Sequence, residues 1–464
     1  MSTSLPTFVP PGPKPLSPVI ALLRTALGDE DNLLSLLPAE AYRVPIGPLG
    51  YSRRQIVIVN EPSLVREVLH DDGERFPKSD LMVDATAPLI GDAMFVSSGE
   101  RWRRQRAMID PAFSHMRVSG AFGAMAEAVD AFETRLDGFV DRGEVLDLDL
   151  AMSQLTADVI CRTIFSTGLD SDASREVFDC FETFENGIGQ VNLLRLIFAP
   201  AFAKTPHPPA VLEACARIRA RLGEFVDPRL DGRVEHDDIC GALIDARHPE
   251  TGERFDREAL VDQLGVFFLA GHETTASVLT WLFYLLVEQP GLASAIREEV
   301  RAVVGDADIT YEHTRQLPVL RAIFRETARL YPPITFLPRV ALQATRLGER
   351  RLKRGALVMV SPWTIHRHET LWRDAHRFDA SRFLPGSEES VPAGAYIPFG
   401  HGPRVCVGAA FATTESLLIV ARLLARYAFE AVDAGDGPVE PVARLTTRPR
   451  HPIRLRVHRQ NDRT

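Results

Sequence analysis

The hydrophobic positions along the chain predict a mainly helical protein. Between residues 61 and 331 the apolar residues recur with a period close to 3.6, the spacing of one helix face. The most apolar stretch, residues 264–287, carries His272 and Glu273 near its centre. A membrane-spanning helix rarely holds two such residues there, so we expect a buried helix of a soluble protein without a membrane anchor.

Strands are predicted to make a smaller contribution. Residues 43–46 and 55–59 contain β-branched residues on either side of Gly and Pro, which suggests a hairpin. Residues 356–365 suggest a further strand. In residues 453–457 apolar and polar positions alternate, and we expect an edge strand there.

Other segments lack a regular hydrophobic period. The Pro-rich residues 1–17 are expected to lie extended on the surface. Residues 78–98 interrupt the helical pattern and predict a long loop, and residues 366–405 predict an irregular segment. Helical periodicity returns over residues 408–427.

Composition narrows the class of protein. The chain has 464 residues, a length that suggests about three domains, yet no segment resembles a linker. The net charge of −9 argues against nucleic acid as a partner. The five cysteines form no CxxC pair, which argues against a disulfide framework or a structural zinc site and favours a reducing compartment, the cytoplasm.

One of these cysteines stands in a distinctive setting. Cys406 follows a turn containing Gly400 and Gly402 and precedes a predicted helix, whose first N–H groups and positive dipole end favour a thiolate. Gly408 allows close backbone approach, and Arg404 adds positive charge. These features predict a metal ligand or a nucleophile. An isolated cysteine of this kind is more often a buried core residue.

The surrounding pattern, F-G-x-G-x-R-x-C-x-G, resembles the haem-ligand loop of the cytochrome P450 family. Its fixed positions are all present, as Phe399, Gly400, Gly402, Arg404, Cys406 and Gly408. The resemblance implies that Cys406 is the axial ligand of the iron of haem b and that Arg404 pairs with a haem propionate. Phe399 and Gly400 would then lie close to the cofactor.

A second motif lies within the buried apolar helix. Ala270, Gly271 and Thr274 share one helix face, and the Thr274 hydroxyl can bond to the carbonyl of Ala270 and bend the helix. Taken alone, a buried helix with a tolerated polar patch explains the motif equally well. The family resemblance implies that Ala270 and Gly271 contact the haem, that Glu273 relays protons and that Thr274 bonds to the bound dioxygen.

A third motif is Glu326-Thr327-Ala328-Arg329, which alone indicates only a common helix-surface ion pair. The family has such a helix and a later segment ending in Arg-Phe. The resemblance implies that Glu326, Arg329 and Arg382 form a buried network that supports the Cys406 loop. Ala380 occupies a position where the family usually has Pro.

Further arginines are candidates for the haem propionates. Trp102 and Arg106 lie four residues apart, the spacing at which the family places propionate partners, and Arg339 resembles another. The basic run around Trp102 could instead be a solvated helix face. By the same resemblance, Val83, Phe268, Phe336 and Leu337 are candidates for an apolar substrate pocket.

The resemblance implies a mainly α fold with a minor β portion, in which residues 1–464 form a single large haem domain. The expected activity is a monooxygenase that inserts one atom of O2 into a lipophilic small molecule by hydroxylation or epoxidation. Electrons would come from a ferredoxin or flavodoxin and its reductase, and the protein would be a monomer.

Two alternatives remain open. One is a peroxygenase that uses peroxide without a redox partner, against which the Glu273–Thr274 pair argues. The other is a non-catalytic haem sensor or carrier, which would have no need of such a pair.

Overall fold

Helices predominate in the computed structural model, which describes residues 5–13, 17, 20, 32–35, 37–49, 52–71, 73–188, 200–234, 237–387, 391–433, 435 and 438–460. The α-helices are α2 (Pro62–His70), α3 (Asp80–Ile90), α4 (Gly99–Ile109), α5 (His115–Gly120), α6 (Phe122–Arg142), α7 (Leu148–Phe165), α8 (Asp172–Ile188), α10 (Pro209–Leu230), α11 (Ile239–Asp245), α12 (Arg257–Glu288), α13 (Pro290–Val304), α14 (Tyr311–Arg315), α15 (Pro318–Leu330), α16 (Pro362–Ile365) and α17 (Ala409–Arg426). Short 3-10 turns are η1 (Ala39–Tyr42), η2 (Asp110–Phe113), η3 (Ala380–Phe383) and η4 (Gly402–Arg404).

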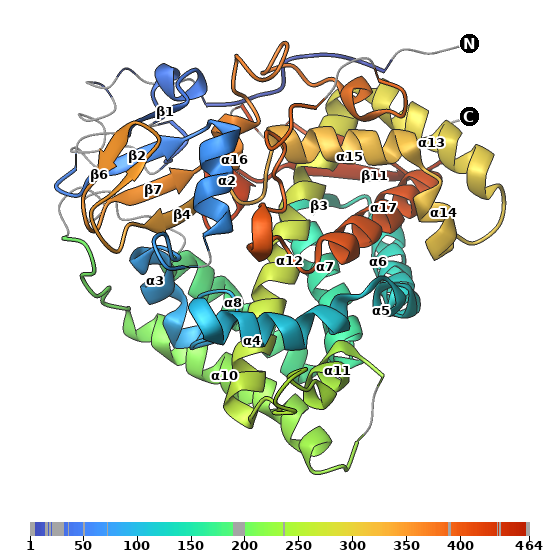
Figure 1. Cartoon of the computed structure of the whole chain (residues 1–464). Helices are drawn as coiled ribbons and strands as arrows, with labels where there is room; N and C mark the ends of the chain where they lie inside the picture. The colour runs from blue at the N-terminus through green and yellow to red at the C-terminus, as the bar shows by residue number, and fades with distance from the viewer. Residues whose placement is uncertain are drawn as a thin grey trace.

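The long helix α12 forms the centre of the molecule (Figure 1). It confirms the buried helix predicted for residues 264–287 and begins earlier, where the Asp256 carboxylate accepts a hydrogen bond from the Ala259 amide. Helices α7 and α17 both pack against it. A Cβ atom at Gly271 would lie 2.4 Å from Ile160 Cδ1, so glycine permits the close contact with α7. No helix in the described ranges has the length and apolar character of a membrane span.

The sheet strands are β1 (Ile46–Pro48), β2 (Ile56–Val59), β3 (Val145–Asp147), β4 (Leu337–Val340), β5 (Thr345–Leu347), β6 (Arg350–Leu352), β7 (Leu357–Val360), β8 (Tyr427–Ala431), β9 (Pro441–Ala443), β10 (Thr447–Pro449) and β11 (Arg454–Arg459). The largest sheet has the order β1-β2-β7-β4 and lies at one side of the helical body (Figure 1). The predicted hairpin is confirmed by β1 and β2, although β1 is shifted toward the turn. Pro48 is tolerated because β1 is an edge strand.

The C-terminal strand is not at an edge, so that prediction was wrong. Strand β11 pairs with β3 on one side and β8 on the other. Leu455 and Val457 are buried while Arg454 and Arg456 are exposed, as the alternation predicted. Alternation along one strand reveals which face is buried, but it carries no information about how many neighbours the strand has.

The long loop predicted over residues 78–98 was also wrong in its first half, because residues 80–90 form α3. The Ser79 side chain caps this helix by accepting a hydrogen bond from the Leu81 amide at 3.2 Å. Leu89 and Ile90 are buried, and the helix packs against α10 and α12. Tertiary packing therefore stabilises a helix whose local sequence contains Pro88.

The strand predicted over residues 356–365 ends after Val360. Ser361 then caps α16, accepting a hydrogen bond from the Thr364 amide at 3.2 Å, and Pro362 occupies the first helical position. Ser followed by Pro is a helix-start signal that apolar periodicity alone does not reveal. Of the Pro-rich segment 1–17, residues 1–4 and 14–16 lie outside the described residues.

Candidate functional site

The loop that carries Cys406 is closed by backbone hydrogen bonds. The Cys406 amide donates to the carbonyl of Phe399 at 2.9 Å. Gly400 and Gly402 have φ values of +77° and +75°, a region that favours glycine. A Cβ atom at Gly402 would also lie 2.7 Å from the His70 ring at the end of α2. The glycines of the motif therefore serve the turn itself and its contact with α2.

The electrostatics of the Cys406 sulfur differ in part from the expectation. Burial raises the pKa of the thiol, although the Gly408 amide donates to the sulfur and the Arg106 charge lowers the pKa. The helix-start amide thus acts as predicted, but Arg106 supplies positive charge that the sequence assigned to Arg404. As a residue, Cys406 is exposed, unlike the other four cysteines. A coordinated metal ion would deprotonate such a thiol outright.

Three of the predicted cofactor residues lie around this loop. The Arg404 guanidinium stacks on the Trp102 ring at 4.5 Å and donates to the carbonyl of Ser97 at 2.8 Å. Arg106 donates to the carbonyl of Val405 at 2.7 Å. Helix α4, which holds Trp102 and Arg106, is therefore joined to the residue immediately before Cys406.

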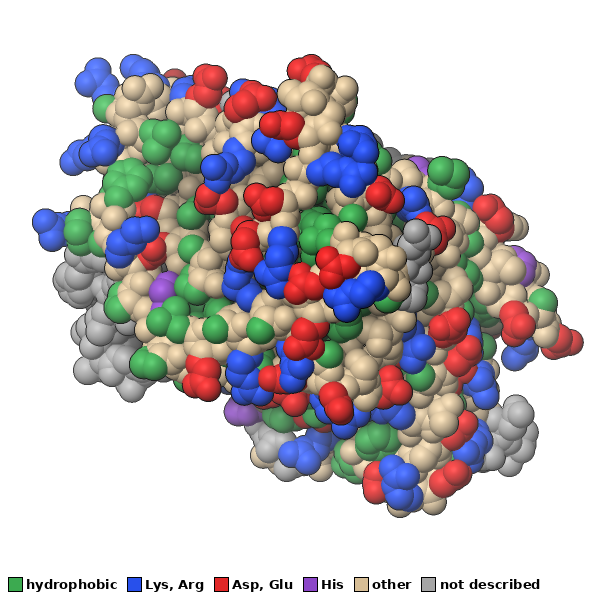
Figure 2. Space-filling view, turned by 90° about the horizontal axis from the view of Figure 1, so that it is seen from below, with side chains coloured by type: hydrophobic (Ala, Val, Ile, Leu, Met, Phe, Trp, Pro, Cys, Tyr) green, Lys and Arg blue, Asp and Glu red, His purple; other side chains and the backbone are tan. Residues whose placement is uncertain are grey.

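The rest of the basic run on α4 behaves as a solvated face. The exposed ion pairs are Arg101–Asp92, Arg103–Glu100 and Arg104–Glu253. Figure 2 shows acidic and basic side chains interspersed over the face of the molecule seen from below. The two interpretations of the run thus apply to different residues, with Trp102 buried and its basic neighbours largely exposed.

A group of cations lies where anionic groups would be accommodated. Arg339 is buried, and burial followed by repulsion from Arg404 lowers its pKa to about 10. Lys78 faces Arg339 across a short antiparallel bridge, and burial with repulsion from Arg339 and Arg404 lowers its pKa well below the usual range. Within the described part of the chain neither Lys78 nor Arg339 has an ion pair. Unmatched buried charge of this kind fits the carboxylates of a haem.

Helix α12 presents a small, accessible surface at its middle. Ala270 is exposed and Gly271 and Thr274 are partly exposed, although most of this helix is buried. The Thr274 hydroxyl donates to the carbonyl of Ala270 at 2.6 Å, as the sequence suggested. The residues present therefore fit a haem: an exposed cysteine, a cationic group, and a helix surface of small residues.

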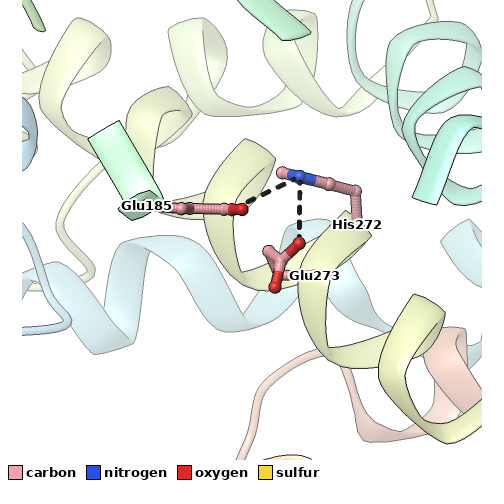
Figure 3. A group of neighbouring side chains, drawn as sticks. All are labelled: Glu185, His272 and Glu273. Atoms are coloured by element: carbon pink, nitrogen blue, oxygen red, sulfur yellow. Dashed lines mark ion pairs between the residues drawn. The ribbon is translucent and has the colours of Figure 1, made fainter. Parts of the chain in front are cut away.

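Glu273 belongs to a buried polar cluster. Its carboxylate forms an ion pair with Arg448 and accepts a hydrogen bond from the Thr446 hydroxyl at 2.9 Å. His272 Nε2 lies 3.8 Å from Glu273 and 3.7 Å from Glu185 of α8, and the three side chains point toward one another (Figure 3). Burial opposes ionisation of Glu273, but Arg448, His272 and Thr446 together hold its pKa below the usual value. These contacts therefore favour the ionised carboxylate of Glu273.

The four candidate pocket residues do not form one set. Val83, Phe336 and Leu337 are partly buried and keep some accessible surface. Phe268 has none and stacks on the Phe181 ring at 4.7 Å. Phe268 is therefore a core residue between α12 and α8, and its assignment to a substrate pocket is corrected. Helical spacing placed it near Ala270 without revealing that α8 covers that face.

Glu326, Arg329 and Arg382 lie in one buried network. Arg329 binds the Glu326 carboxylate through two hydrogen bonds of 2.7 and 2.8 Å. Its other N–H groups donate to the carbonyls of His366, Ala375 and Arg377. Arg382 lies 3.6 Å from Glu326. Ala380, which replaces a proline of the family pattern, is fully buried in η3 and does not disturb this arrangement.

A histidine connects this network to the segment that leads to Cys406. His366 Nδ1 bonds to the carbonyl of Arg329 at 3.0 Å, and its Nε2 accepts the amide of Ile397 at 2.8 Å. Because one nitrogen meets a carbonyl and the other an amide, the ring must be neutral, and burial lowers its pKa well below the usual value. Ile397 in turn accepts the Gly400 amide.

The sequence did not single out Lys78, Glu185, His366 or Arg448. Lys78 lies in a segment predicted to be a loop. The His-Arg-His run at 366–368 suggests at most a metal site and gives no sign of the bridging role of His366. Arg448 and Glu185 reach Glu273 from β10 and α8, 175 and 88 residues away along the chain. No local pattern indicates such contacts. Only covariation between distant positions could have revealed them.

Comparison with known proteins gives a consistent result. The cytochrome P450 family model matches residues 10–456. Cyclooctat-9-en-7-ol 5-monooxygenase of Streptomyces melanosporofaciens is 33% identical over 92% of this chain and 90% of its own length. Pentalenene oxygenase of Streptomyces avermitilis is 30% identical over 85% and 86%. The crystal structure of a mutant cytochrome P450DA heme domain superposes with a TM-score of 0.80 at 26% identity, covering 98% of both chains.

Proposed function

The chain belongs to the cytochrome P450 family, and on that premise we propose that Cys406 is the axial ligand of a haem b. The protein is a monooxygenase, an oxidoreductase that inserts one atom of O2 into a lipophilic small molecule. The observation that carries the assignment of Cys406 is that this exposed cysteine accepts the Gly408 amide in a loop whose Arg404 lies near Lys78 and Arg339.

The haem carboxylates would be held by residues from four separate segments. Neither Arg339 nor Lys78 forms an ion pair with a described carboxylate, and Arg404 lies close enough to repel both. The Trp102 ring stacks on the Arg404 guanidinium, and Arg106 donates a hydrogen bond to the carbonyl of Val405. Phe399 and Gly400 shape the loop on the sulfur side. Ala270 and Gly271 would lie against the opposite face of the cofactor.

When bound, a thiolate-ligated haem reduces O2 and cleaves its O–O bond. The chain must deliver protons to that site. The Thr274 hydroxyl donates to Ala270, which leaves its oxygen lone pairs free to accept a hydrogen bond and its proton able to move. The contacts of Glu273 favour its ionised form, so it must take up a proton before it can deliver one, and His272 and Glu185 are the neighbours with which it can exchange.

The proposed setting follows from the same premise. Residues 1–464 would form one haem domain that works as a monomer in the cytoplasm. The free thiols of Cys161, Cys180, Cys215 and Cys240 suit a reducing compartment. A ferredoxin or flavodoxin with its reductase would supply electrons. Because Arg101, Arg103 and Arg104 are already paired with acids, we expect little electrostatic steering from that part of α4.

The ligand assignment is tested by the absorption of the reduced carbon monoxide complex. Cys406→Ala should lose the red-shifted Soret band that a thiolate ligand produces. Cys180→Ala is the matched control, because this free thiol is buried on α8, and it should keep the band. A red-shifted band retained in Cys406→Ala would overturn the assignment.

The reaction class is tested by turnover with a surrogate ferredoxin system. The wild type should need O2 and a reduced partner to form hydroxylated product. In Thr274→Ala, reduced nicotinamide should still be consumed, but hydrogen peroxide should replace product. Product formed from added peroxide without a partner would indicate a peroxygenase, and no product at all would indicate a sensor or carrier. Cyclooctat-9-en-7-ol and pentalenene, for which two relatives are named, are the first substrates to try.

A further inference from the structure

We propose that Glu185, His272 and Glu273 form a binding site for a divalent metal ion of the zinc type, separate from the proposed haem ligand, and that an ion bound there blocks the proton exchange proposed above for Glu273. One nitrogen and two oxygens converge from α8 and α12 (Figure 3). Their donor atoms all lie within 4.8 Å of one another. A set of one imidazole and two carboxylates suits Zn2+ and related first-row ions.

The hydrogen bonding of His272 fixes which of its nitrogens is available. Nδ1 lies 2.7 Å from the carbonyl of Phe268, which can only accept, so Nδ1 carries the hydrogen. In the neutral ring, Nε2 is then a bare lone pair. It lies 3.7 Å from Glu185 Oε1 and 3.8 Å from Glu273 Oε1, too far for a hydrogen bond to either. The side chain is only 2% exposed, and Nε2 faces two carboxylate oxygens.

The carboxylates supply a second, independent sign. Among the described residues, Glu185 Oε1 is buried without a hydrogen-bond partner. Three carboxylates, from Asp149, Glu185 and Glu273, surround the single Arg448 guanidinium, which leaves two net negative charges when all are ionised. Buried acceptors and net negative charge require a cation or protons. A divalent ion would match this charge.

The distances are close to those of a metal site. A tetrahedral ion with bonds of about 2.0–2.1 Å holds its ligand atoms about 3.3–3.4 Å apart. The separations from His272 Nε2, 3.7 and 3.8 Å, exceed this by a few tenths of an ångström. The two carboxylate oxygens lie within 4.8 Å of each other, and the side chain of Glu185 would have to close any remaining gap. Glu185 is 21% exposed, so an ion and a coordinating water can enter from its side.

The surrounding contacts match those that support metal ligands. A ligating histidine usually donates its other N–H to a carbonyl, as His272 does to Phe268, and a ligating carboxylate is usually hydrogen-bonded, as Glu273 is by Thr446. Arg448 donates to the same Glu273 oxygen that faces His272. A carboxylate oxygen has two lone-pair positions, so Arg448 and an ion can share it.

The test is Zn2+ titration of the haem-loaded protein against a chromophoric chelator. The wild type should bind one equivalent that Glu185→Gln binds at least about tenfold more weakly, and His272→Ala should weaken binding further. Glu182→Gln is the matched control, since it removes an exposed acid from the same helix and should bind like the wild type. The thermal midpoint of each variant verifies folding, and Glu185→Gln decides if His272→Ala does not fold.

X-ray absorption at the zinc edge then identifies the ligands. The expected spectrum has only nitrogen and oxygen neighbours, including one imidazole. Three results would each overturn the site: no saturable zinc binding by the wild type, equal affinity in Glu185→Gln and Glu182→Gln, or sulfur in the zinc ligand shell. None of these measurements depends on catalytic turnover.

Discussion

The buried pair Glu326–Arg329 and the buried pair Glu273–Arg448 have the same chemistry in different surroundings. Every N–H group of Arg329 meets the Glu326 carboxylate or a backbone carbonyl. Around Glu273, in contrast, His272 Nε2 makes no hydrogen bond to the nearby carboxylates, and Glu185 Oε1 has no partner in the described ranges. The Glu326–Arg329 pair therefore has no Arg329 N–H group left to bind another partner.

This difference separates a structural cluster from one that can do chemistry. A fully satisfied network stabilises a single arrangement, because any movement leaves a buried polar group unpaired. A partly satisfied network can take up protons or a cation without breaking its existing bonds. The network around Glu273 also borders Thr274, the next residue along α12. The network around Glu326 and Arg329, in contrast, reaches the Cys406 loop only through His366.

The largest effect is expected from Glu326→Ala. It would leave the Arg329 guanidinium buried without its carboxylate, and arginine cannot neutralise itself by losing a proton. We expect a loss of about 3–5 kcal/mol in the free energy of unfolding, with poor haem content. Urea unfolding and the ratio of haem to protein absorbance measure this.

Glu312→Ala is the matched control, since Glu312 and Arg315 form an exposed pair at the same spacing. This variant should lose less than about 0.5 kcal/mol in the free energy of unfolding. Similar losses in both variants would show that burial of the Glu326 pair is energetically unimportant.

A smaller effect is expected from Arg448→Met. This variant strands the carboxylates of Glu273 and Asp149, which can neutralise themselves by binding protons. We expect a loss of about 1–3 kcal/mol near pH 7. Arg448 lowers the pKa of Glu273, so its stabilisation is present above the unfolded pKa and is lost as the pH falls. The difference in the free energy of unfolding between the variant and the wild type should therefore become smaller as the pH falls. A difference that grows would contradict this account.

The smallest effect on stability is expected from Glu185→Gln. Burial and repulsion from Glu273 raise the pKa of Glu185 well above its usual value. Protonated Glu185 therefore stabilises the wild type at pH values below the pKa that this group has in the unfolded chain. This stabilisation is lost as the pH rises through the pKa of Glu185 in the folded protein. The variant should gain stability relative to the wild type with rising pH. Chemical unfolding across a pH series measures this, and Glu182→Gln should give no such trend.

Local signals allowed the core of the candidate site to be predicted. The turn before Cys406, the helix that follows it, and the Thr274–Ala270 bond all depend on residues close in sequence. The network partners Glu326 and Arg329 are three apart on one helix, so their pairing was equally accessible. What the sequence could not reveal was that this pair is completely buried.

The parts that could not be predicted depend on contacts between distant segments. Strand β11 has neighbours on both sides because β3, more than 300 residues earlier, pairs with it. Helix α3 exists because α10 and α12 cover it. The same holds for Phe268, which α8 buries, and for Arg448, which approaches Glu273 from the C-terminal part of the chain. Apolar periodicity describes a segment and does not identify its neighbours.

The His366 side chain that accepts the Ile397 amide affects hydrogen exchange with solvent. Amides in irregular segments usually exchange quickly, through small local openings. Here the amides of Ile397, Gly400 and Cys406 are all bonded within a segment tied to the Arg329 carbonyl through that imidazole. They should exchange as slowly as the amides of α12, only when the protein unfolds globally. The loop that carries the proposed iron ligand would then open no more readily than the core.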